Sequence, residues 1–510
     1  MKTHDALILG SSPSALVAAA ILARAGWSVA VLESRDSVGG PVTTETFAPG
    51  FRADTGAPSA ALAFEIAEDL DLTIGEVRRE TITALAPEPL TLREITRPVP
   101  GDTLQSSRVP ILTGAAFTHP ALPSAFHHAV HLLRRIHRTP PPDVPSPEGA
   151  DKASLASLAG DLFAHGPRNV HEILRLLFLS VRDFLREADV PPLVQGLLAT
   201  VAMRGVSAGP FDPGTLLGLV QQTALQDGLY TSTVFGGLGN LANALADAAR
   251  SYGAEIRLSV PGPLRVDVVD GAARGVILAN GERALANVVL SDHDARRTFT
   301  ELVSPALLDP EFNRTIRHLR YRGATARVHL ALDKQPAFHG VGAGALRGTL
   351  VLAPDVESLE RAWDQAKRGS LPSHPPIEVT IPTTLDPTLA PAGKHVLAAT
   401  IHDIPAGFAD PDALLRTLLE RLSPFAPDLA SSVLHSQVTL PRDIESRFGL
   451  TEGHLLGGEP THPQFFFLRP FPGFARYRTP IEGLYLCGSA AHPAGYSGLS
   501  GYNLARSLLG

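Results

Sequence analysis

The first thirty-three residues constrain the fold more than any other segment, because they have the order strand, tight turn, helix, strand and acidic residue. We predict a strand from Ala6 to Leu9, a helix from Ala15 to Ala25 and a second strand from Ser28 to Leu32. Both strands are continuously apolar, as in a parallel sheet covered on two faces, and Gly26 closes the helix. This βαβ unit predicts an α/β fold with a doubly wound, Rossmann-like sheet.

The turn after the first strand departs from the Gly-x-Gly-x-x-Gly pattern of dinucleotide-binding proteins. Only Gly10 is kept, and Ser12 and Ala15 take the second and third glycine positions, with Ser14 between them. Small side chains there still let a phosphate approach the backbone and the helix pack on the strand. Glu33, which follows the second strand, is placed to accept hydrogen bonds from ribose hydroxyls. We predict a dinucleotide here, with its pyrophosphate at the helix N-terminus; the alternative is a βαβ unit without a ligand.

Three later segments strengthen this interpretation: Glu33 to Pro41 with its paired glycine, Gly236 to Val260, and Gly483 to Gly495, which holds a Gly-Ser turn after a strand. In these segments the chain resembles the phytoene desaturase and flavin amine oxidase superfamily, and most closely its pyridine nucleotide-disulphide oxidoreductase domain-containing members. The resemblance implies FAD as a non-covalent cofactor. It adds these cofactor-binding residues to the first turn and Glu33: Ser34, Arg35, Gly39, Gly40, Val260, Gly488, Ser489, Gly498 and Leu499.

The same resemblance implies a reaction in which a substrate carbon loses a hydride to the flavin and a proton is released. The sequence identifies no firm catalytic acid or base. His492 lies between the closing turn and the last helix, where it could shuttle a proton or fix the turn by hydrogen bonds to the backbone. Tyr496 stands where relatives carry glycine, and it could stack near the flavin or fill the space that glycine leaves. Both alternatives stay open.

The chain is long enough for two domains, which we expect to be interleaved. We assign residues 1–75, 226–300 and 441–510 to an FAD-binding domain, and residues 76–225 and 301–440 to an α+β substrate-binding domain. The second set is rich in Leu, Val, Ala and Phe, which fits an apolar substrate pocket and fits an ordinary core equally well.

We therefore expect an FAD-dependent desaturase or dehydrogenase that acts on an apolar small molecule, such as a carotenoid, another polyisoprenoid or a secondary-metabolite intermediate. A flavin-dependent oxidase of an amine or amide is one alternative, and a non-catalytic FAD-binding scaffold is another. The chain has one dinucleotide fingerprint and no second one for a nicotinamide cofactor. Electrons should then leave to dioxygen or a quinone.

Composition excludes several other classes. A net charge of -7 gives no basic surface for nucleic acid, and no zinc-type spacing of Cys and His is present. His127 and His131 are spaced as a helical pair but lack a third ligand, so we predict no metal site. The single cysteine, Cys487, suits a reducing, cytoplasmic compartment. The amphipathic segment from Phe126 to Arg138 could make a peripheral membrane contact.

Overall fold

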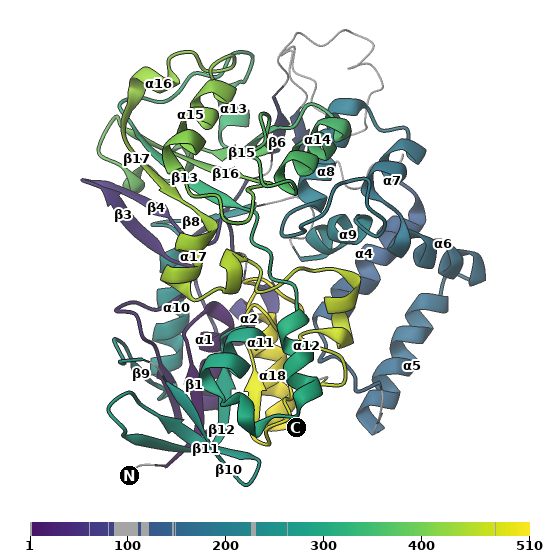
Figure 1. Cartoon of the computed structure of the whole chain (residues 1–510), viewed down its shortest axis with the longest axis vertical. Helices are drawn as coiled ribbons and strands as arrows, with labels where there is room; N and C mark the ends of the chain where they lie inside the picture. The colour runs from purple at the N-terminus through teal and green to yellow at the C-terminus, as the bar shows by residue number, and fades with distance from the viewer. Residues whose placement is uncertain are drawn as a thin grey trace.

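Two large sheets organise the computed structural model, which describes residues 3–60, 62–79, 81–85, 111–113, 122–144, 147, 149–225, 231–262, 264–474 and 476–510. Figure 1 shows the first sheet in the lower half of the molecule and the second sheet in the upper half, with a group of helices beside it. Both ends of the chain lie with the first sheet.

The first sheet has a parallel core in the spatial order β9-β2-β1-β12-β18. The bounds of these strands are Glu255–Arg257, Val29–Leu32, Thr3–Leu9, Arg283–Ser291 and Leu484–Leu486. Strands β10 (Arg265–Val269) and β11 (Ala272–Ile277) extend it by antiparallel pairing. Helix α1 (Pro13–Arg24) joins β1 to β2. The predicted βαβ unit and Rossmann-like α/β sheet are therefore confirmed.

The strand order reverses between β1 and β12. From β1 the chain proceeds through β2 to β9 on one side, and it returns to β12 and β18 on the other side. Ligands of such sheets bind in the crevice that this reversal leaves at the carboxyl ends of the strands. Gly10 follows β1 and Asp292 follows β12, so both residues lie at this crevice.

The second sheet has the order β17-β13-β16-β15-β14-β6-β7. The bounds are Val433–Thr439, Ala326–Leu332, His395–Ile401, Ile377–Thr380, Thr349–Leu352, Thr81–Ala84 and Ile111–Thr113. A hairpin of β3 (Thr44–Ala48) and β4 (Phe51–Asp54) packs against it and brings N-terminal residues to the junction of the two sheets. A further pair joins β5 (Glu76–Arg79) to β8 (Thr231–Val234).

Helices cover both sheets. Those near the first sheet are α2 (Phe64–Asp69), α10 (Leu238–Ser251), α11 (Ala295–Arg297), α12 (Pro310–His318) and α18 (Leu499–Leu509). A separate group beside the second sheet comprises α4 (Ser124–His137), α5 (Gly149–Phe163), α6 (Pro167–Phe178), α7 (Val181–Glu187), α8 (Pro192–Ala202) and α9 (Leu216–Leu225). The remaining helices are α13 (Ala343–Leu346), α14 (Val356–Ala366), α15 (Pro411–Leu422), α16 (Leu429–Ser432) and α17 (Pro441–Phe448).

The apolar side of α4 is buried in the core of this helical group. Phe126, Val130 and Leu133 are all buried, and the Phe126 ring stacks on Phe184 of α7 with 5.3 Å between centroids. The membrane contact predicted for this segment stays a prediction, and this packing gives it no support. No helix among the described residues is both long and apolar enough to cross a membrane.

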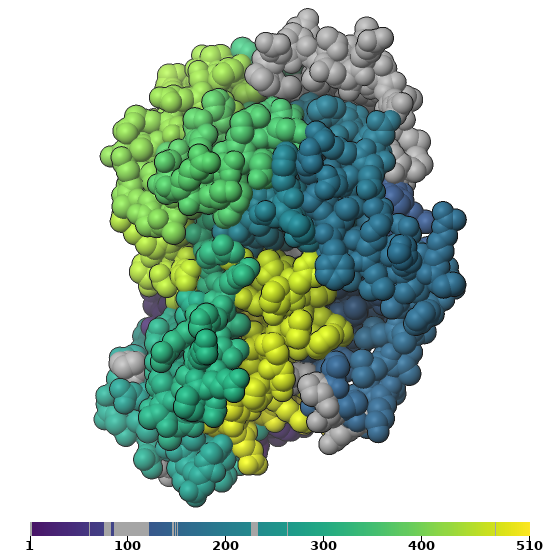
Figure 2. Space-filling view, turned by 45° about the vertical axis from the view of Figure 1, so that its right-hand side comes forward, coloured from purple at the N-terminus to yellow at the C-terminus, as the bar shows by residue number. Residues whose placement is uncertain are grey.

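The apolar periodicity from Val170 to Arg186 predicts one helix, and this prediction is wrong. The structure has two helices there, because Leu179 is extended and the Ser180 side chain accepts a hydrogen bond from the Asp183 amide to begin α7. The glycine run from 340 to 344 predicts a turn. The structure has a turn at residues 339–340, and the short helix α13 begins at Ala343. The predicted domain boundaries stay a prediction. Figure 2 shows the C-terminal segment, in yellow, between a teal segment and the blue helical group.

Candidate functional site

The turn after β1 forms the centre of the predicted dinucleotide site. Gly10 has φ +102°, and a Cβ atom built on it would lie 2.8 Å from Cβ of Asp292, so only glycine suits this position. The Ser11 hydroxyl donates to a Glu33 carboxylate oxygen at 2.5 Å, and the Gly39 amide donates to the Ser11 carbonyl at 2.9 Å. The structure thus brings the turn, the acidic residue and the first glycine of the pair together.

Glu33 gathers the residues predicted beside it. Its carboxylate also accepts hydrogen bonds from the Arg35 amide at 2.9 Å and the Ser34 hydroxyl at 3.4 Å. Its carbonyl accepts a hydrogen bond from the Val260 amide at 2.9 Å, which places the residue after β9 next to the end of β2. The Arg35 guanidinium turns away and donates to the Gly40 carbonyl at 2.5 Å, so it closes the glycine loop.

The start of α18 meets the start of α1. The Ser500 hydroxyl donates to the Cys487 carbonyl at 2.7 Å, and it lies within hydrogen-bond distance of the Ser14 hydroxyl, at 2.8 Å. A Cβ atom on Gly501 would lie 1.8 Å from the Ser14 carbonyl oxygen, so the two helices are in backbone contact. Gly498 is the N-cap of α18, directly before Leu499. The C-terminal turn therefore reaches the N-terminal one, as the predicted site requires.

Asp292 is a residue that sequence reasoning missed. Its carboxylate accepts hydrogen bonds from the Ser12 amide at 2.7 Å and from the Ser12 hydroxyl. Burial, with a smaller contribution from Glu33, raises the pKa of Asp292 from 3.8 to about 7, against the hydrogen bonds from Ser12, which lower it. The available signal was an acidic residue two positions after the apolar run 288–290. The sequence does not show that the strand before Asp292, β12, pairs with β1.

The polar groups at this crevice fit the diphosphate and ribose of FAD, with one exception. The first amides of α1 and α18 lack partners within their helices and can donate to an anion. Buried hydroxyls surround them, from Ser11, Ser12, Ser14, Ser489 and Ser500. The exception is Asp292. Its carboxylate accepts a hydrogen bond from the amide of Ser12, and Ser12 is at the second position of the fingerprint, whose backbone normally contacts the pyrophosphate.

The two weak catalytic candidates lie in different surroundings. His492 is 1% exposed, its Nε2 is 2.9 Å from the Ile136 carbonyl oxygen, and burial lowers its pKa to about 4. His492 therefore connects the turn before α18 to α4 through this contact, and it does not line the cavity described in the next paragraph. Tyr496 lines that cavity, and its hydroxyl donates to the Leu455 carbonyl.

A cavity of about 160 Å³ lies between the second sheet and the turn before α18. The residues that line it include Asp54 at the end of the hairpin, Tyr496 before α18, and residues of β13, β14, β15 and β16. The Leu-, Val-, Ala- and Phe-rich composition of the expected substrate domain fits an ordinary core as well as an apolar pocket, and the lining of this cavity is not purely apolar. It includes the ionisable residues Asp54, Arg204, Arg322, Arg327, Glu378, His402, Asp403 and His454.

Two ion pairs neutralise most of this charge. The Arg204 Nε atom lies 2.9 Å from one Glu378 carboxylate oxygen, and His402 Nε2 lies 2.8 Å from the same oxygen. Burial alone would raise the pKa of Glu378, but Arg204 and His402 outweigh it and hold that pKa well below its ordinary value. Arg322 makes a bidentate pair with the fully buried Glu459, at 2.7 and 2.8 Å.

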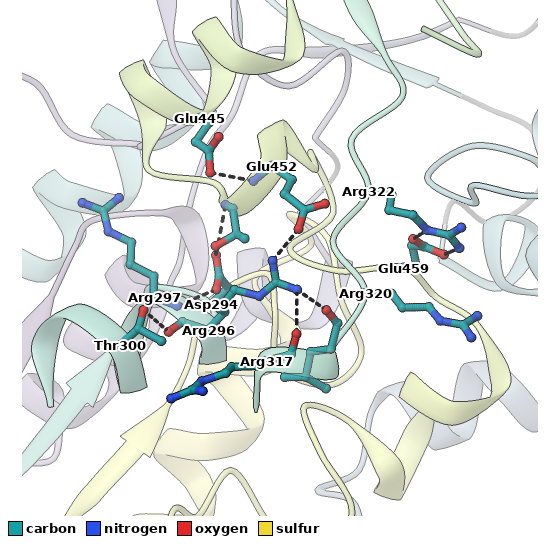
Figure 3. Close-up of polar contacts among 12 residues, drawn as sticks. Asp294, Arg296, Arg297, Thr300, Arg317, Arg320, Arg322, Glu445, Glu452 and Glu459 are labelled. Atoms are coloured by element: carbon teal, nitrogen blue, oxygen red, sulfur yellow. Dashed lines mark hydrogen bonds and ion pairs between the residues drawn. The ribbon is translucent and has the colours of Figure 1, made fainter. Parts of the chain in front are cut away.

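A polar network joins the end of β12 to the segment before residue 453 (Figure 3). The Asp294 carboxylate, just after β12, accepts hydrogen bonds from the Thr451 hydroxyl at 2.7 Å and the Thr451 amide at 3.2 Å. Arg296 donates to the Glu452 carboxylate. Residues 451 and 452 directly precede residues 453–456, which line the cavity. Among the described residues, no group of three or more His, Cys, Asp or Glu side chains is arranged to hold a metal ion.

Comparisons with known proteins agree with this geometry. Residues 8–67 match the model of the NAD(P)-binding Rossmann-like domain. Among solved structures, an oxidoreductase from Methanosarcina mazei has a TM-score of 0.60 at 18% identity, covering 99% of both chains. Cyclohexylamine oxidase from Brevibacterium oxydans has a TM-score of 0.57 at 17% identity, covering 100% of both. At these identities the likeness shows the fold.

The sequence relatives show the family. Pyridine nucleotide-disulfide oxidoreductase domain-containing protein 2 of Mus musculus is 30% identical, over 98% of this chain and 92% of the relative. Phytoene desaturase of Fusarium fujikuroi is 22% identical, over 96% of this chain and 85% of the relative. The chain therefore belongs to the family of pyridine nucleotide-disulfide oxidoreductase domain-containing protein 2, and it is also similar in sequence to the phytoene desaturases.

Proposed function

We propose that this protein is an FAD-dependent oxidoreductase that oxidises a small organic substrate in the cavity between its second sheet and the turn before α18. The observation that carries the proposal is the position of Tyr496, which lines the cavity and stands two residues before Gly498, the N-cap of the helix that meets the dinucleotide turn. The cavity and the dinucleotide crevice are therefore adjacent. Bound FAD would supply the two-electron acceptor. The first turns of α1 and α18 would hold its diphosphate, and Glu33 its ribose.

The protein's own groups would orient the substrate and take up its proton. Asp403 lines the cavity, and burial raises its pKa to about 7, which is suited to accepting a proton near neutral pH. Asp403 is a second residue that sequence reasoning missed, because only the fold brings it to the cavity. The Tyr496 hydroxyl is held by the Leu455 carbonyl, so its ring has a fixed place in the wall.

The charged lining favours a polar substrate over a polyisoprenoid. Six acidic or basic side chains and two histidines are among the residues that line the cavity. Arg327 is not in any ion pair of the described residues, and a long hydrocarbon would keep its charge desolvated without offering a partner. The amine or amide oxidation considered as an alternative is thus better supported than carotenoid desaturation. Dioxygen or a quinone remains the proposed electron acceptor.

Cofactor release tests the proposal. Purified protein should be yellow, and denaturation should release FAD rather than FMN or a nicotinamide dinucleotide, as resolved by chromatography. Anaerobic bleaching of the bound flavin by a substrate would then separate an enzyme from a non-catalytic scaffold. A colourless protein that takes up no added FAD would contradict the proposal.

A further inference from the structure

Arg327 is a buried cation that faces the cavity. It lies on β13, in the second sheet, and is 4% exposed. Burial lowers its pKa to about 10, although Asp54 and Glu378 raise it by Coulomb interaction. Arg327 is therefore still charged at neutral pH.

The hydrogen bonds of Arg327 do not neutralise that charge. Its guanidinium donates to the Thr400 hydroxyl and, at 3.1 Å, to the Asp54 carbonyl oxygen, and it lies 3.4 Å from His329 Nε2. Its Nε–H is buried and has no partner. Among the ion pairs of the described residues none includes Arg327, whereas the two other arginines of the lining are paired with Glu378 and Glu459.

A buried guanidinium without an ionic partner is unfavourable in the free protein. Desolvation penalises the charge, and replacement of such a group by an apolar side chain is often neutral or stabilising. Groups that oppose stability in this way are typical of binding sites, where the ligand supplies the missing interaction. The planar fork of arginine matches a carboxylate, which can accept two parallel hydrogen bonds.

We propose that Arg327 binds a carboxylate group of the substrate and so selects organic acids for the cavity. This inference rests on the proposed function, because it assumes that the substrate enters this cavity. Glu378 does not prevent an anion from binding, since Arg204 and His402 already engage its carboxylate. The Thr400 hydroxyl, beside Arg327, is a further donor within the lining.

The test uses acetate, propionate and benzoate as probes, each with its neutral amide as a matched control. Titration of the FAD-bound protein should perturb the flavin spectrum saturably with at least one acid, and its amide should bind about tenfold or more weakly. Arg327→Met should reduce the affinity for that acid to that of its amide. The melting temperature of the variant without a probe should be unchanged or higher, a result that a purely structural role of Arg327 would not give.

A second variant controls for the loss of charge. Arg322→Met combined with Glu459→Gln removes another lining guanidinium together with its partner, and it should change the acid affinity less than about threefold. Arg327→Lys keeps the charge without the planar fork and should retain part of the affinity.

Three results would overturn the inference: no acid binds the wild-type protein, each acid and its amide bind equally, or Arg327→Met keeps the acid affinity. In the last case a shifted flavin reduction potential would place the guanidinium against the flavin instead. Failure of the proposed function is distinguishable. If the protein takes up no FAD, the thermal shift of the flavin-free protein by each acid, with and without Arg327→Met, still decides the role of Arg327.

Discussion

At the scale of single residues, Asp292 distinguishes the predicted dinucleotide site of this chain from the usual Gly-x-Gly-x-x-Gly turn. Its carboxylate accepts a hydrogen bond from the Ser12 amide, where a pyrophosphate should approach, and burial raises the pKa of Asp292 from 3.8 to about 7. The folded protein therefore binds a proton at the Asp292 carboxylate more tightly than the unfolded chain does. The contribution of Asp292 to stability is most favourable at low pH, falls as the pH rises from about 4 to about 7, and stays low above that range.

Asp292→Asn should remove this pH dependence. The amide cannot ionise, so the variant should be more stable than the wild type at pH 8 by on the order of a few kcal/mol and similar to it at pH 4. It should also bind FAD more tightly at pH 8, because a charge that opposes the diphosphate is lost. Urea unfolding and FAD titration at both pH values measure these effects. Asp364→Asn, at the surface, is the control and should not become more stable than the wild type at pH 8. Equal stability of the wild type and Asp292→Asn at pH 8 would contradict the prediction.

Glu33→Ala should weaken FAD retention. The carboxylate is the group assigned to the ribose, and hydrogen bonds to a charged group contribute about 1.5 to 3 kcal/mol each, which corresponds to a loss of affinity of about tenfold to hundredfold. Equilibrium dialysis with FAD is the measurement. Glu33→Gln keeps an acceptor for the Ser11 hydroxyl and should lose less. Unchanged retention in Glu33→Ala would show that the ribose lies elsewhere.

At the scale of elements, the sequence predicts what local patterns determine. The unit β1-α1-β2 follows from apolar runs, and the paired glycine and the C-terminal Gly-Ser turn are recognisable as motifs. The position of Asp292 depends on the register of β12 against β1, and that of Arg327 on its place in β13. Such pairings join residues far apart in the chain, and no local pattern determines them. The break between α6 and α7 was missed for another reason: the Ser180 cap interrupts a continuous apolar periodicity.

Gly501→Ala should destabilise the junction of α1 and α18. The added methyl group would meet the Ser14 carbonyl oxygen at 1.8 Å, so one helix must move, at a cost of about 1–3 kcal/mol. Gly160→Ala, in the exposed part of α5 with open space around it, should instead gain about 0.5–1 kcal/mol from helix propensity. Chemical denaturation of both variants measures the difference. Equal shifts in the two variants would mean that the helices do not meet as described.

At the scale of the whole molecule, the protein has one dinucleotide fingerprint for its two sheets. We expect that NADPH does not reduce the bound flavin efficiently, because a reductase of this kind needs a second pyrophosphate turn and helix N-terminus for the nicotinamide cofactor. Stopped-flow mixing of oxidised protein with NADPH should give slow or no bleaching of the flavin. Rapid, saturable bleaching would contradict this expectation and place the protein among the reductases.

The order of strands in the first sheet also governs how the chain can fold during its synthesis. β1 can pair with β2 and β12 early, but the side of β12 that receives β18 stays open until residues 484–486 have been made. Until then the backbone of β12 at Val289 and Leu290 has no strand on that side, and a strand of another chain can pair with it. Aggregation in the cell should therefore depend on how quickly the C-terminal segment docks, and a variant that slows its docking should need chaperones even where the finished fold is stable.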